Sequence, residues 1–390
     1  MKSLSYLLTI LLLISCKKNK IEEQQPNGSK IDNEASQGGV KLGYSYAKGK
    51  WHQLSTTELT GDLHLSSKDI YLYSIEGSLQ YHSYFRRYNQ ASNTWQELYK
   101  IVNPKGERIS IDAKDNVYML ITDLRTEGSG FNMKYYYNYK VQQLKSNDQW
   151  ESLTDVPNPS QKDFTEIDLK FVGGKLHFIG IRDNKLTIIS LHNGTWSETA
   201  SINEVINSGK YFAHQNSDGE FIFAIGIQSP KNTYITYKFD GSSIQLINTS
   251  ILNHELVTFG ADGFYASDKP DAKLIDITRQ KEIFHLTAFK ANGELYNRRV
   301  NSILPQSSLR SSNQYIYAQV QNYVIPEWLN EVLAVHNTQT GKTMWFPNTP
   351  NYNSKAIINS VVNRGKRHYF ALQKQLIYIS QKHIYYFEEE

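Results

Sequence analysis

A polar turn that leads directly into an apolar run recurs along this chain. In the clearest copy, the turn at residues 217–220 (Ser-Asp-Gly-Glu) precedes the run at residues 221–226 (Phe-Ile-Phe-Ala-Ile-Gly). A glycine-containing polar turn followed by β-branched and aromatic residues is typical of a tight hairpin that feeds a buried strand. Helical periodicity is nearly absent elsewhere, so the pattern predicts an all-β protein.

The same turn-and-strand unit occurs seven times, and its spacing predicts the fold. The turns lie about 45 to 60 residues apart, at 67–69, 114–116, 173–175, 218–220, 262–263, 312–314 and 364–366. This period is typical of propeller blades, which are four-stranded sheets that pack around an axis. We therefore predict a seven-bladed β-propeller, with six or eight blades as alternatives. The blades are expected near residues 55–98, 99–153, 154–198, 199–247, 248–286, 287–347 and 348–390.

Five tryptophans follow polar turns in phase with this repeat: Trp51, Trp95, Trp150, Trp196 and Trp345. They fall where the outermost strand of a blade should begin. We expect them to seal one blade against the next by burying apolar surface, rather than to bind ligands.

Residues 44–54 look like the outer half of a blade that has no inner half before it. We expect this segment to complete the last blade and close the ring. Closure of this kind would remove two exposed sheet edges.

The first 16 residues have the features of a targeting segment. Met1-Lys2 gives a positive start, and the apolar stretch at 4–14 is too short to span a bilayer as a helix. The stretch ends Leu13-Ile14-Ser15-Cys16, which resembles the lipobox of bacterial lipoproteins. The resemblance implies that residues 1–15 are removed and that Cys16, the only cysteine in the chain, is acylated, for example with palmitate. The alternative is an ordinary secretory signal with an incidental cysteine.

Residues 16–40 are predicted to be a flexible tether, and residues 41–390 the propeller. The tether is rich in Lys, Gln, Asn, Glu, Gly and Ser, and it has too little apolar surface to order itself. Its basic run at 17–20 would lie near anionic head groups beside a lipidated cysteine. Some Bacteroidetes-type surface lipoproteins have an acidic run at this place. The run in this chain is basic instead, which favours attachment on the periplasmic face at least as much as attachment at the cell surface. We expect a lipid anchor in the bacterial cell envelope, on the periplasmic face or at the outer-membrane surface.

The order of turn, strand, hairpin and Asn-x-Trp is similar to that of kelch-type and sialidase-type propellers across most of residues 44–390. Kelch repeats carry a Gly-Gly pair after the second strand, whereas Gly173-Gly174 precedes its strand. The stretch at 190–196 (Ser-Leu-His-Asn-Gly-Thr-Trp) lacks the aspartate of the sialidase Asp box and is one residue shorter. The resemblance implies a propeller, and neither catalytic set carries over.

Candidate binding residues follow from the loops that join second to third strands, since ligands usually enter a propeller at that end of its channel. The longest such loop is expected at residues 122–132 and offers Asp123 and Arg125. The equivalent shorter turn offers Arg182 and Asp183. Trp328 lies out of phase with the repeat, either as a plug under its loop or as a stacking surface for a sugar or peptide. The alternative to ligand binding is that the charged side chains at these hairpin tips are simply solvated.

Other chemistry finds little support in the sequence. A net charge of +4 without a basic stripe argues against a nucleic-acid partner. The 11 histidines lack metal-ligand spacing, and neither a phosphate-binding glycine loop nor a Gly-x-Ser-x-Gly motif occurs, so no metal or cofactor is expected.

The sequence leaves three functions open, the third of which is a scaffold whose blade sides bind other envelope proteins through an exposed apolar patch. We expect a binding or interaction module for a glycan or a partner protein at the channel mouth. The alternative is a carbohydrate-active enzyme, a hydrolase or lyase, at the same mouth. Two carboxylates, or a tyrosine and histidine with an arginine, converging in the channel would favour the enzyme. A mouth lined by Asn, Ser and Lys would favour binding, which is what we expect.

Overall fold

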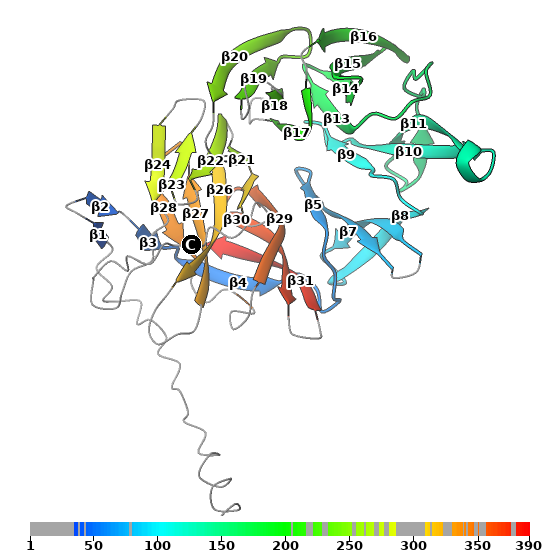
Figure 1. Ribbon diagram of the computed structural model, residues 1–390. Coiled ribbons are helices and arrows are strands. Elements are labelled where there is room, and N and C mark those ends of the chain that lie inside the picture. The colour runs from blue at the N-terminus through cyan, green and yellow to red at the C-terminus, as the bar shows by residue number, and fades with distance from the viewer. Residues whose placement is uncertain are drawn as a thin grey trace, which may run out of the picture.

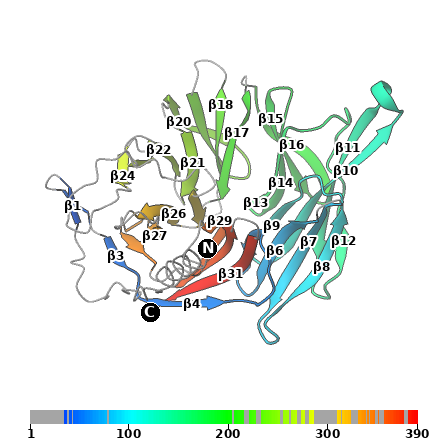
Figure 2. The same cartoon turned by 60° about the horizontal axis from the view of Figure 1, so that its bottom comes forward.

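The computed structural model shows an all-β propeller (Figures 1 and 2). The described residues are 35–37, 40–42, 44–77, 80–203, 206–215, 221–227, 233–251, 255–260, 263–268, 273–276, 281–285, 309–312, 314–322, 330–337, 339–340, 342–346, 350, 356–375 and 380–390. Within them, no helix is both long enough and apolar enough to cross a membrane.

The first three four-stranded antiparallel sheets follow one another along the chain. They contain β5 (Asp62–Leu65), β6 (Ile70–Glu76), β7 (His82–Asn89) and β8 (Thr94–Val102); then β9 (Arg108–Ile111), β10 (Val117–Glu127), β11 (Lys134–Leu144) and β12 (Trp150–Ser152); and then β13 (Glu166–Val172), β14 (Lys175–Arg182), β15 (Lys185–His192) and β16 (Thr195–Ile202).

Two more sheets have the same consecutive order. They contain β17 (Ile206–Gln215), β18 (Phe221–Ile227), β19 (Thr233–Phe239) and β20 (Ile244–Ile251), followed by β21 (Glu255–Gly260), β22 (Gly263–Asp268), β23 (Lys273–Asp276) and β24 (Lys281–His285).

The remaining sheets include strands from the start of the chain. One has the order β25 (Leu309–Ser312), β26 (Tyr315–Asn322), β27 (Asn330–Asn337), β28 (Thr343–Trp345) and β3 (Tyr44–Tyr46). Another has the order β29 (Ala356–Arg364), β30 (Arg367–Gln375), β31 (Ser380–Glu389) and β4 (Gly49–Gln53). A separate pair consists of β1 (Ala35–Gln37) and β2 (Val40–Leu42), and a 3-10 turn, η1, spans Gly130–Asn132.

The first strands of successive sheets form a closed circuit. Contacts run from β5 to β9, β13, β17, β21, β25 and β29 in turn, and β29 contacts β5 again. In Figure 1, the labelled first strands β5, β9, β13, β17, β21 and β29 lie around one centre, which we call the channel. The propeller prediction is confirmed at the level of the fold, while the number of blades stays a prediction.

The predicted repeat markers lie where the sequence placed them. The second strands β6, β10, β14, β18, β22, β26 and β30 each begin at or within two residues of a predicted turn. Trp95, Trp150, Trp196 and Trp345 lie on the fourth strands of their sheets, and Trp51 lies on β4.

The sealing role predicted for the tryptophans is confirmed at two of them. The Trp150 indole N–H donates to the Leu98 carbonyl of the preceding sheet at 3.1 Å, and its ring packs against Phe85 there. Trp51 packs against Phe346 of the neighbouring sheet, with ring centroids 5.7 Å apart.

The expected closure is confirmed for part of residues 44–54. Strand β4 pairs antiparallel with β31, in the register Trp51↔Phe387, and so completes the last sheet. Strand β3 departs from the prediction because it pairs in parallel with β28 and becomes the fifth strand of the neighbouring sheet. The start of the chain therefore joins two sheets, since β3 and β4 are separated by only two residues. We call this pair of strands the clasp.

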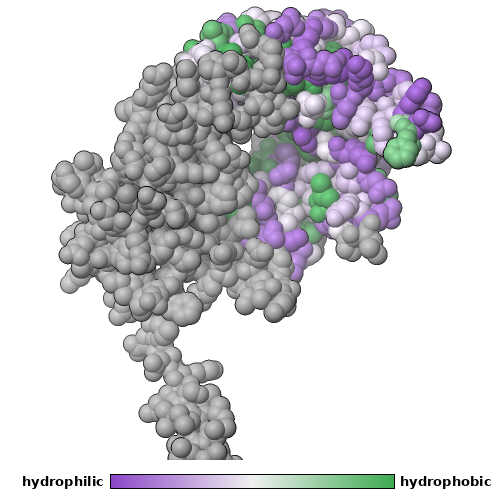
Figure 3. Space-filling model, viewed as in Figure 1, coloured by the Kyte–Doolittle hydropathy of each residue, from purple (hydrophilic) through white to green (hydrophobic). Residues whose placement is uncertain are grey.

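The core lies between neighbouring sheets. One cluster joins the sheets of β9–β12 and β13–β16 around the fully buried Tyr139 and Phe178, and another joins the sheets of β13–β16 and β17–β20 around Ile188 and Phe223. Hydrophilic residues make up most of the coloured outer surface in Figure 3. The hydrophobic effect therefore acts mainly on the flat faces of the sheets, which stabilises the ring as a whole.

Candidate functional site

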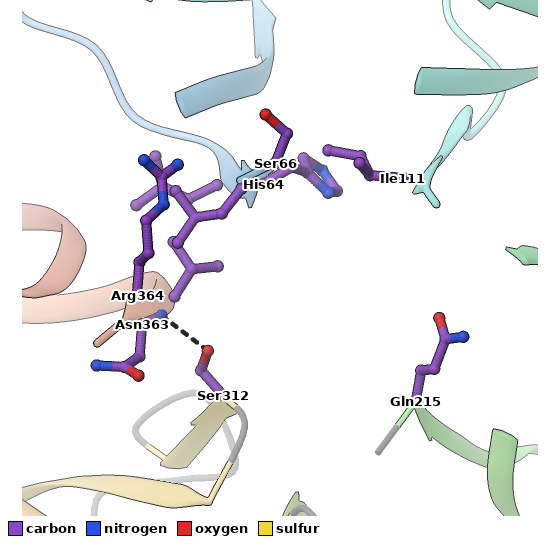
Figure 4. Close-up of a pocket in the computed structure, with 10 residues that line it drawn as sticks. His64, Ser66, Ile111, Gln215, Ser312, Asn363 and Arg364 are labelled. Atoms are coloured by element: carbon purple, nitrogen blue, oxygen red, sulfur yellow. Dashed lines mark hydrogen bonds between the residues drawn. The ribbon is translucent and has the colours of Figure 1, made fainter. Parts of the chain in front are cut away.

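A cavity of about 430 Å³ lies in the channel, where the first strands of several sheets end. Small-molecule sites usually occupy roughly 300 to 1,000 Å³, so the cavity has room for a small ligand. The ends of β5, β9, β17, β25 and β29 line it, with Leu63, His64, Leu65, Ser66, Ile111, Gln215, Ser312, Val362, Asn363 and Arg364. In Figure 4, Gln215 lies across an open space from Ser312 and Asn363, while the Arg364 guanidinium points toward the β5–β6 turn.

The cavity lies at the opposite end of the channel from the loops chosen by sequence. First strands end at the turns to second strands. Arg182 ends β14 and Asp183 lies in the β14–β15 turn, while Asp123 and Arg125 lie on the part of β10 that leads to the β10–β11 turn, so all four belong to connections between second and third strands. In an antiparallel sheet of consecutive strands, these two kinds of turn lie at opposite ends of the strands.

Arg364 is fixed at the cavity by two backbone carbonyls of the next sheet. Its Nη1 donates to the Lys68 oxygen at 3.2 Å and its Nη2 donates to the Asp69 oxygen at 2.6 Å. The Nε atom is buried and has no hydrogen-bond partner among the described residues. Arg364 therefore brings a positive charge to the wall and holds the β29–β30 turn against the β5–β6 turn.

A carboxylate in electrostatic range of Arg364, that of Asp115, is already engaged. Asp115 accepts hydrogen bonds from the Ser67 backbone N–H and the Ser67 hydroxyl. These bonds, with smaller contributions from Lys68 and Arg364, lower the pKa of the Asp115 carboxyl below its usual value. Asp115 is partly buried on the β9–β10 turn, and it is not among the residues that line the cavity.

Asn363 connects the cavity wall to a buried hydrogen-bond chain. Its backbone N–H donates to the Ser312 hydroxyl at 2.8 Å, which is the dashed line in Figure 4. Its Nδ2 lies 3.2 Å from His368 Nδ1, and the Tyr317 hydroxyl lies 2.7 Å from the same nitrogen. Because the Asn363 amide nitrogen can only donate, His368 Nδ1 accepts, and Nε2–H donates to Glu389 at 2.9 Å.

This Tyr317–His368–Glu389 chain has the atom order of a catalytic relay but no access for a substrate. Both Tyr317 and His368 are fully buried. The chain is therefore structural, and it rigidifies the junction between the β25–β28 sheet and the last sheet.

His64 lines the cavity as a neutral imidazole at physiological pH. Burial, with a smaller contribution from the nearby Lys170 cation, lowers its pKa to about 4. Lys170 itself is paired with Asp168, at 3.1 Å. His64 therefore offers one donor and one acceptor to a ligand but no charge.

Charged groups also lie along the channel strands beyond this cavity. Arg108 on β9 donates through Nε to the Ile167 carbonyl at 2.9 Å. Burial raises the pKa of Glu166 on β13 above its usual value, while Arg108 opposes that shift. Burial, followed by the charges of Asp168 and Glu166, raises the pKa of Tyr211 well above 10. The Tyr211 hydroxyl is buried without a hydrogen-bond partner in the described part of the chain.

Asp123 and Arg125 lie on strands and not on a loop. Strand β10 continues to Glu127 and β11 begins at Lys134, because their backbones pair without interruption over residues 117–127 and 134–144. The expected loop at 122–132 is thus a two-stranded arm with a short turn at its tip, which projects from the body in Figures 1 and 2.

Both charges on this arm have partners of their own. Asp123 pairs with Lys140 at 2.7 Å, and Arg125 pairs with Glu127 at 3.0 Å and lies over the Tyr136 ring. Exposed pairs of this kind contribute little to stability.

Arg182 supports the loop between β12 and β13. Its Nη1 donates to Asn158 Oδ1 at 2.6 Å and to Ser160 Oγ at 2.8 Å, and its guanidinium lies over the Phe164 ring. Asp183 is exposed at the β14–β15 turn, where its backbone φ is +51° and Lys162 lies 3.9 Å away. The structure gives the carboxylates of Asp123 and Asp183 different lysine partners.

Two predicted residues, Cys16 and Trp328, lie outside the described residues. The lipid attachment and the stacking surface stay predictions. Among the described residues, no group of three or more His, Cys, Asp or Glu side chains could hold a metal ion.

Sequence reasoning missed His64, Gln215 and Arg364 as members of one site. Arg364 begins one of the recognised turns, and Gln215 closes the strand before another. A rule that examined the last two residues of every first strand would have found this set.

Solved structures similar to this chain include a β-propeller domain, a polysaccharide lyase and a sialidase. The β-propeller domain of the Trilobed protease from Pyrococcus furiosus is 9% identical, with 83% of this chain and 97% of that chain covered and a TM-score of 0.46. Polysaccharide lyase Uly1 is 12% identical, with coverage of 94% and 95% and a TM-score of 0.46. A Trypanosoma rangeli sialidase is 6% identical, with coverage of 91% and 58% and a TM-score of 0.42.

No family model matches the chain, and the search of curated proteins found no match.

Proposed function

We propose that this protein is a lipid-anchored binding module of the bacterial envelope, which holds a small polyhydroxylated ligand of the glycan class in its channel cavity. The supporting observation is the cavity of about 430 Å³, where His64, Ser66, Gln215 and Ser312 stand beside aliphatic side chains. Sugars present hydroxyl groups and apolar C–H faces together, so a wall of mixed character fits them.

The cavity favours binding over catalysis. Neither Asp nor Glu is among the described residues that line it. General acid and base catalysis of glycoside cleavage would require carboxylates near the bond. The neutral His64 and the amide of Gln215 can orient a ligand without polarising a bond strongly.

We further propose that the ring consists of seven blades, which are the sheets beginning with β5, β9, β13, β17, β21, β25 and β29. The circuit of contacts among these first strands supports this count. A ring of seven also places β29 next to β5. The start of the chain can then pair with its end, as β4 does with β31.

The lipid anchor on Cys16 is proposed from the lipobox alone. Several acyl chains on the new N-terminus would hold the propeller at a membrane surface. Metabolic labelling with a palmitate analogue tests the proposal, because a Cys16→Ser variant would lose both the label and the membrane fraction.

Binding in the cavity can be tested against binding on the arm. A glycan array followed by calorimetry on the purified protein should give a glycan whose affinity falls at least tenfold in an Ile111→Trp variant, which fills the cavity. An Arg125→Ala variant on the arm should bind as the wild type does. The opposite result, with loss in Arg125→Ala alone, would overturn the channel as the binding place.

An enzyme is a second candidate because of the charged groups on β9 and β13. The raised pKa of Glu166 is what a general acid requires, and Arg108 lies within electrostatic range of it. Bond cleavage that is present in the wild type and lost in Glu166→Gln, with binding retained, would favour this alternative.

A further inference from the structure

The wall of the channel cavity carries a guanidinium with no described counter-ion. The polar and charged side chains that line the cavity are His64, Ser66, Gln215, Ser312, Asn363 and Arg364, and none of them is acidic. His64 is neutral, so Arg364 alone gives the wall a charge. No ion pair of Arg364 with a described carboxylate occurs, and Asp115 nearby is committed to Ser67.

The guanidinium is also held in place before any ligand arrives. Two of its five N–H groups donate to the carbonyls of Lys68 and Asp69. These neutral acceptors orient the group without cancelling its charge. A preorganised cation loses little conformational entropy on binding, which favours affinity.

Desolvation makes an anion at this position more favourable. The Nε atom of Arg364 is buried without a partner among the described residues, so part of the cation has lost its water and gained no hydrogen bond there. An oxyanion in the cavity would compensate that charge, and carboxylate, sulfate and phosphate groups all match the geometry of a guanidinium.

We propose that the ligand of the channel cavity is an acidic sugar, with its oxyanion toward Arg364 and its hydroxyl groups toward His64 and Gln215. This inference rests on the proposed glycan-binding function and adds the substrate class to it. Arg364 and Gln215 lie at different sides of the cavity lining in Figure 4, which suits a ligand with an acidic end and a neutral end.

The test compares sugars that differ only in charge. Calorimetry on the purified protein at low salt would use glucose with glucuronate and glucose 6-sulfate, and galactose with galacturonate. We expect at least one acidic sugar to bind tenfold or more tightly than its neutral parent, with an affinity that falls as salt is raised. The sulfate and carboxylate members show which oxyanion is preferred.

Two arginine variants assign the effect to the cavity. In Arg364→Gln, we expect the ratio of the affinities for the acidic sugar and its neutral parent to shrink to within about twofold. Arg125→Gln on the arm removes the same charge elsewhere and should keep the full preference. Because Arg364 also joins two turns, thermal unfolding of each variant is measured, and Arg364→Lys, which keeps the charge, should retain part of the preference.

The possible outcomes distinguish a failure of the acidic-sugar proposal from a failure of the proposed glycan-binding function. Equal affinity of the wild type for acidic and neutral sugars would overturn the acidic ligand and leave glycan binding intact. A preference that persists in a folded Arg364→Gln variant would overturn the role of Arg364. Inorganic sulfate or phosphate that binds as tightly as the sugars would overturn a sugar ligand, and no binding of any probe would overturn both proposals.

Discussion

The backbone N–H of Leu63 donates to the side-chain oxygen of Ser360 at 3.0 Å, across 297 residues of sequence. Leu63 lies on β5 and Ser360 on β29, so the bond joins the first complete sheet to the last at the channel wall. Both residues are buried. Near them, Asn359 donates to the Thr60 hydroxyl, and Arg364 binds the β5–β6 turn.

A Ser360→Ala substitution should therefore weaken the junction between the first and last sheets. Loss of the acceptor leaves the Leu63 N–H buried and unpaired, which costs about 1 to 3 kcal/mol. Chemical denaturation would measure the change in the free energy of unfolding. As a control, Thr233→Val removes a buried hydroxyl with no partner among the described residues, and it should be neutral or stabilising.

Trp51 should be a main contributor to the clasp formed by β4. Its ring packs against Phe346, Phe370 and Phe387 at centroid distances of 5.3 to 5.7 Å. Trp51→Ala should cost about 2 to 4 kcal/mol, because these aromatic contacts and the buried area are lost. His52→Ala, on the exposed side of the same strand, should change the unfolding temperature much less. Equal effects of the two variants would refute this role for Trp51.

Deletion of residues 44–54 should lower the unfolding temperature by many degrees. The deletion exposes the edge of β31 and removes the parallel partner of β28. Differential scanning calorimetry of the truncated and intact proteins provides the measurement. A truncated protein that melts like the intact one would show that the clasp is dispensable.

The glycine pair at the β13–β14 turn should tolerate alanine unequally. Both glycines have positive φ, at +55° for Gly173 and +78° for Gly174, so either substitution introduces backbone strain of about 1 to 2 kcal/mol. A methyl group at Gly173 would also lie 2.6 Å from the Asp240 carbonyl of the next sheet, whereas Gly174 has nothing within 4 Å. Gly173→Ala should therefore be clearly more destabilising than Gly174→Ala in denaturation curves.

The stability of the protein should depend on pH through His64. Its pKa is lowered to about 4 in the folded protein, below the ordinary value of 6.5, so the unfolded chain binds more protons between these values. The contribution of neutral His64 is complete above pH 6.5 and is lost as the pH falls through about 4. One proton corresponds to a slope of up to about 1.4 kcal/mol per pH unit.

Denaturation curves of wild type and His64→Gln between pH 4 and 7 would measure this slope. We expect the variant to show a smaller loss of stability at low pH, since glutamine does not titrate. His177, whose pKa is also lowered to about 4 by burial, remains in both proteins and contributes equally to both. Parallel curves for the two proteins would contradict the assignment to His64.

The sequence by itself determined the fold class, the second strands and the tryptophan-bearing outer strands. These features are local: a polar turn, an alternating apolar run and a tryptophan in phase each depend on residues within one sheet. The joining of β4 to β31 could also be predicted, because an outer half-blade at the start of a chain needs a partner at its end. The pairing of β3 with β28 could not, since a three-residue strand carries too little pattern to choose an edge.

Only the tertiary structure decided where the candidate site lies. Residues such as His64, Gln215 and Arg364 are each about 150 residues apart in the chain, and they meet because the ends of first strands converge on one axis. The pairing of Asp123 with Lys140 likewise depends on the length of the β10–β11 arm. The contact of Arg182 with Asn158 depends on the course of the loop between β12 and β13. Local periodicity specifies strands, but a cavity arises from the packing of sheets distant in sequence, and no local pattern records that packing.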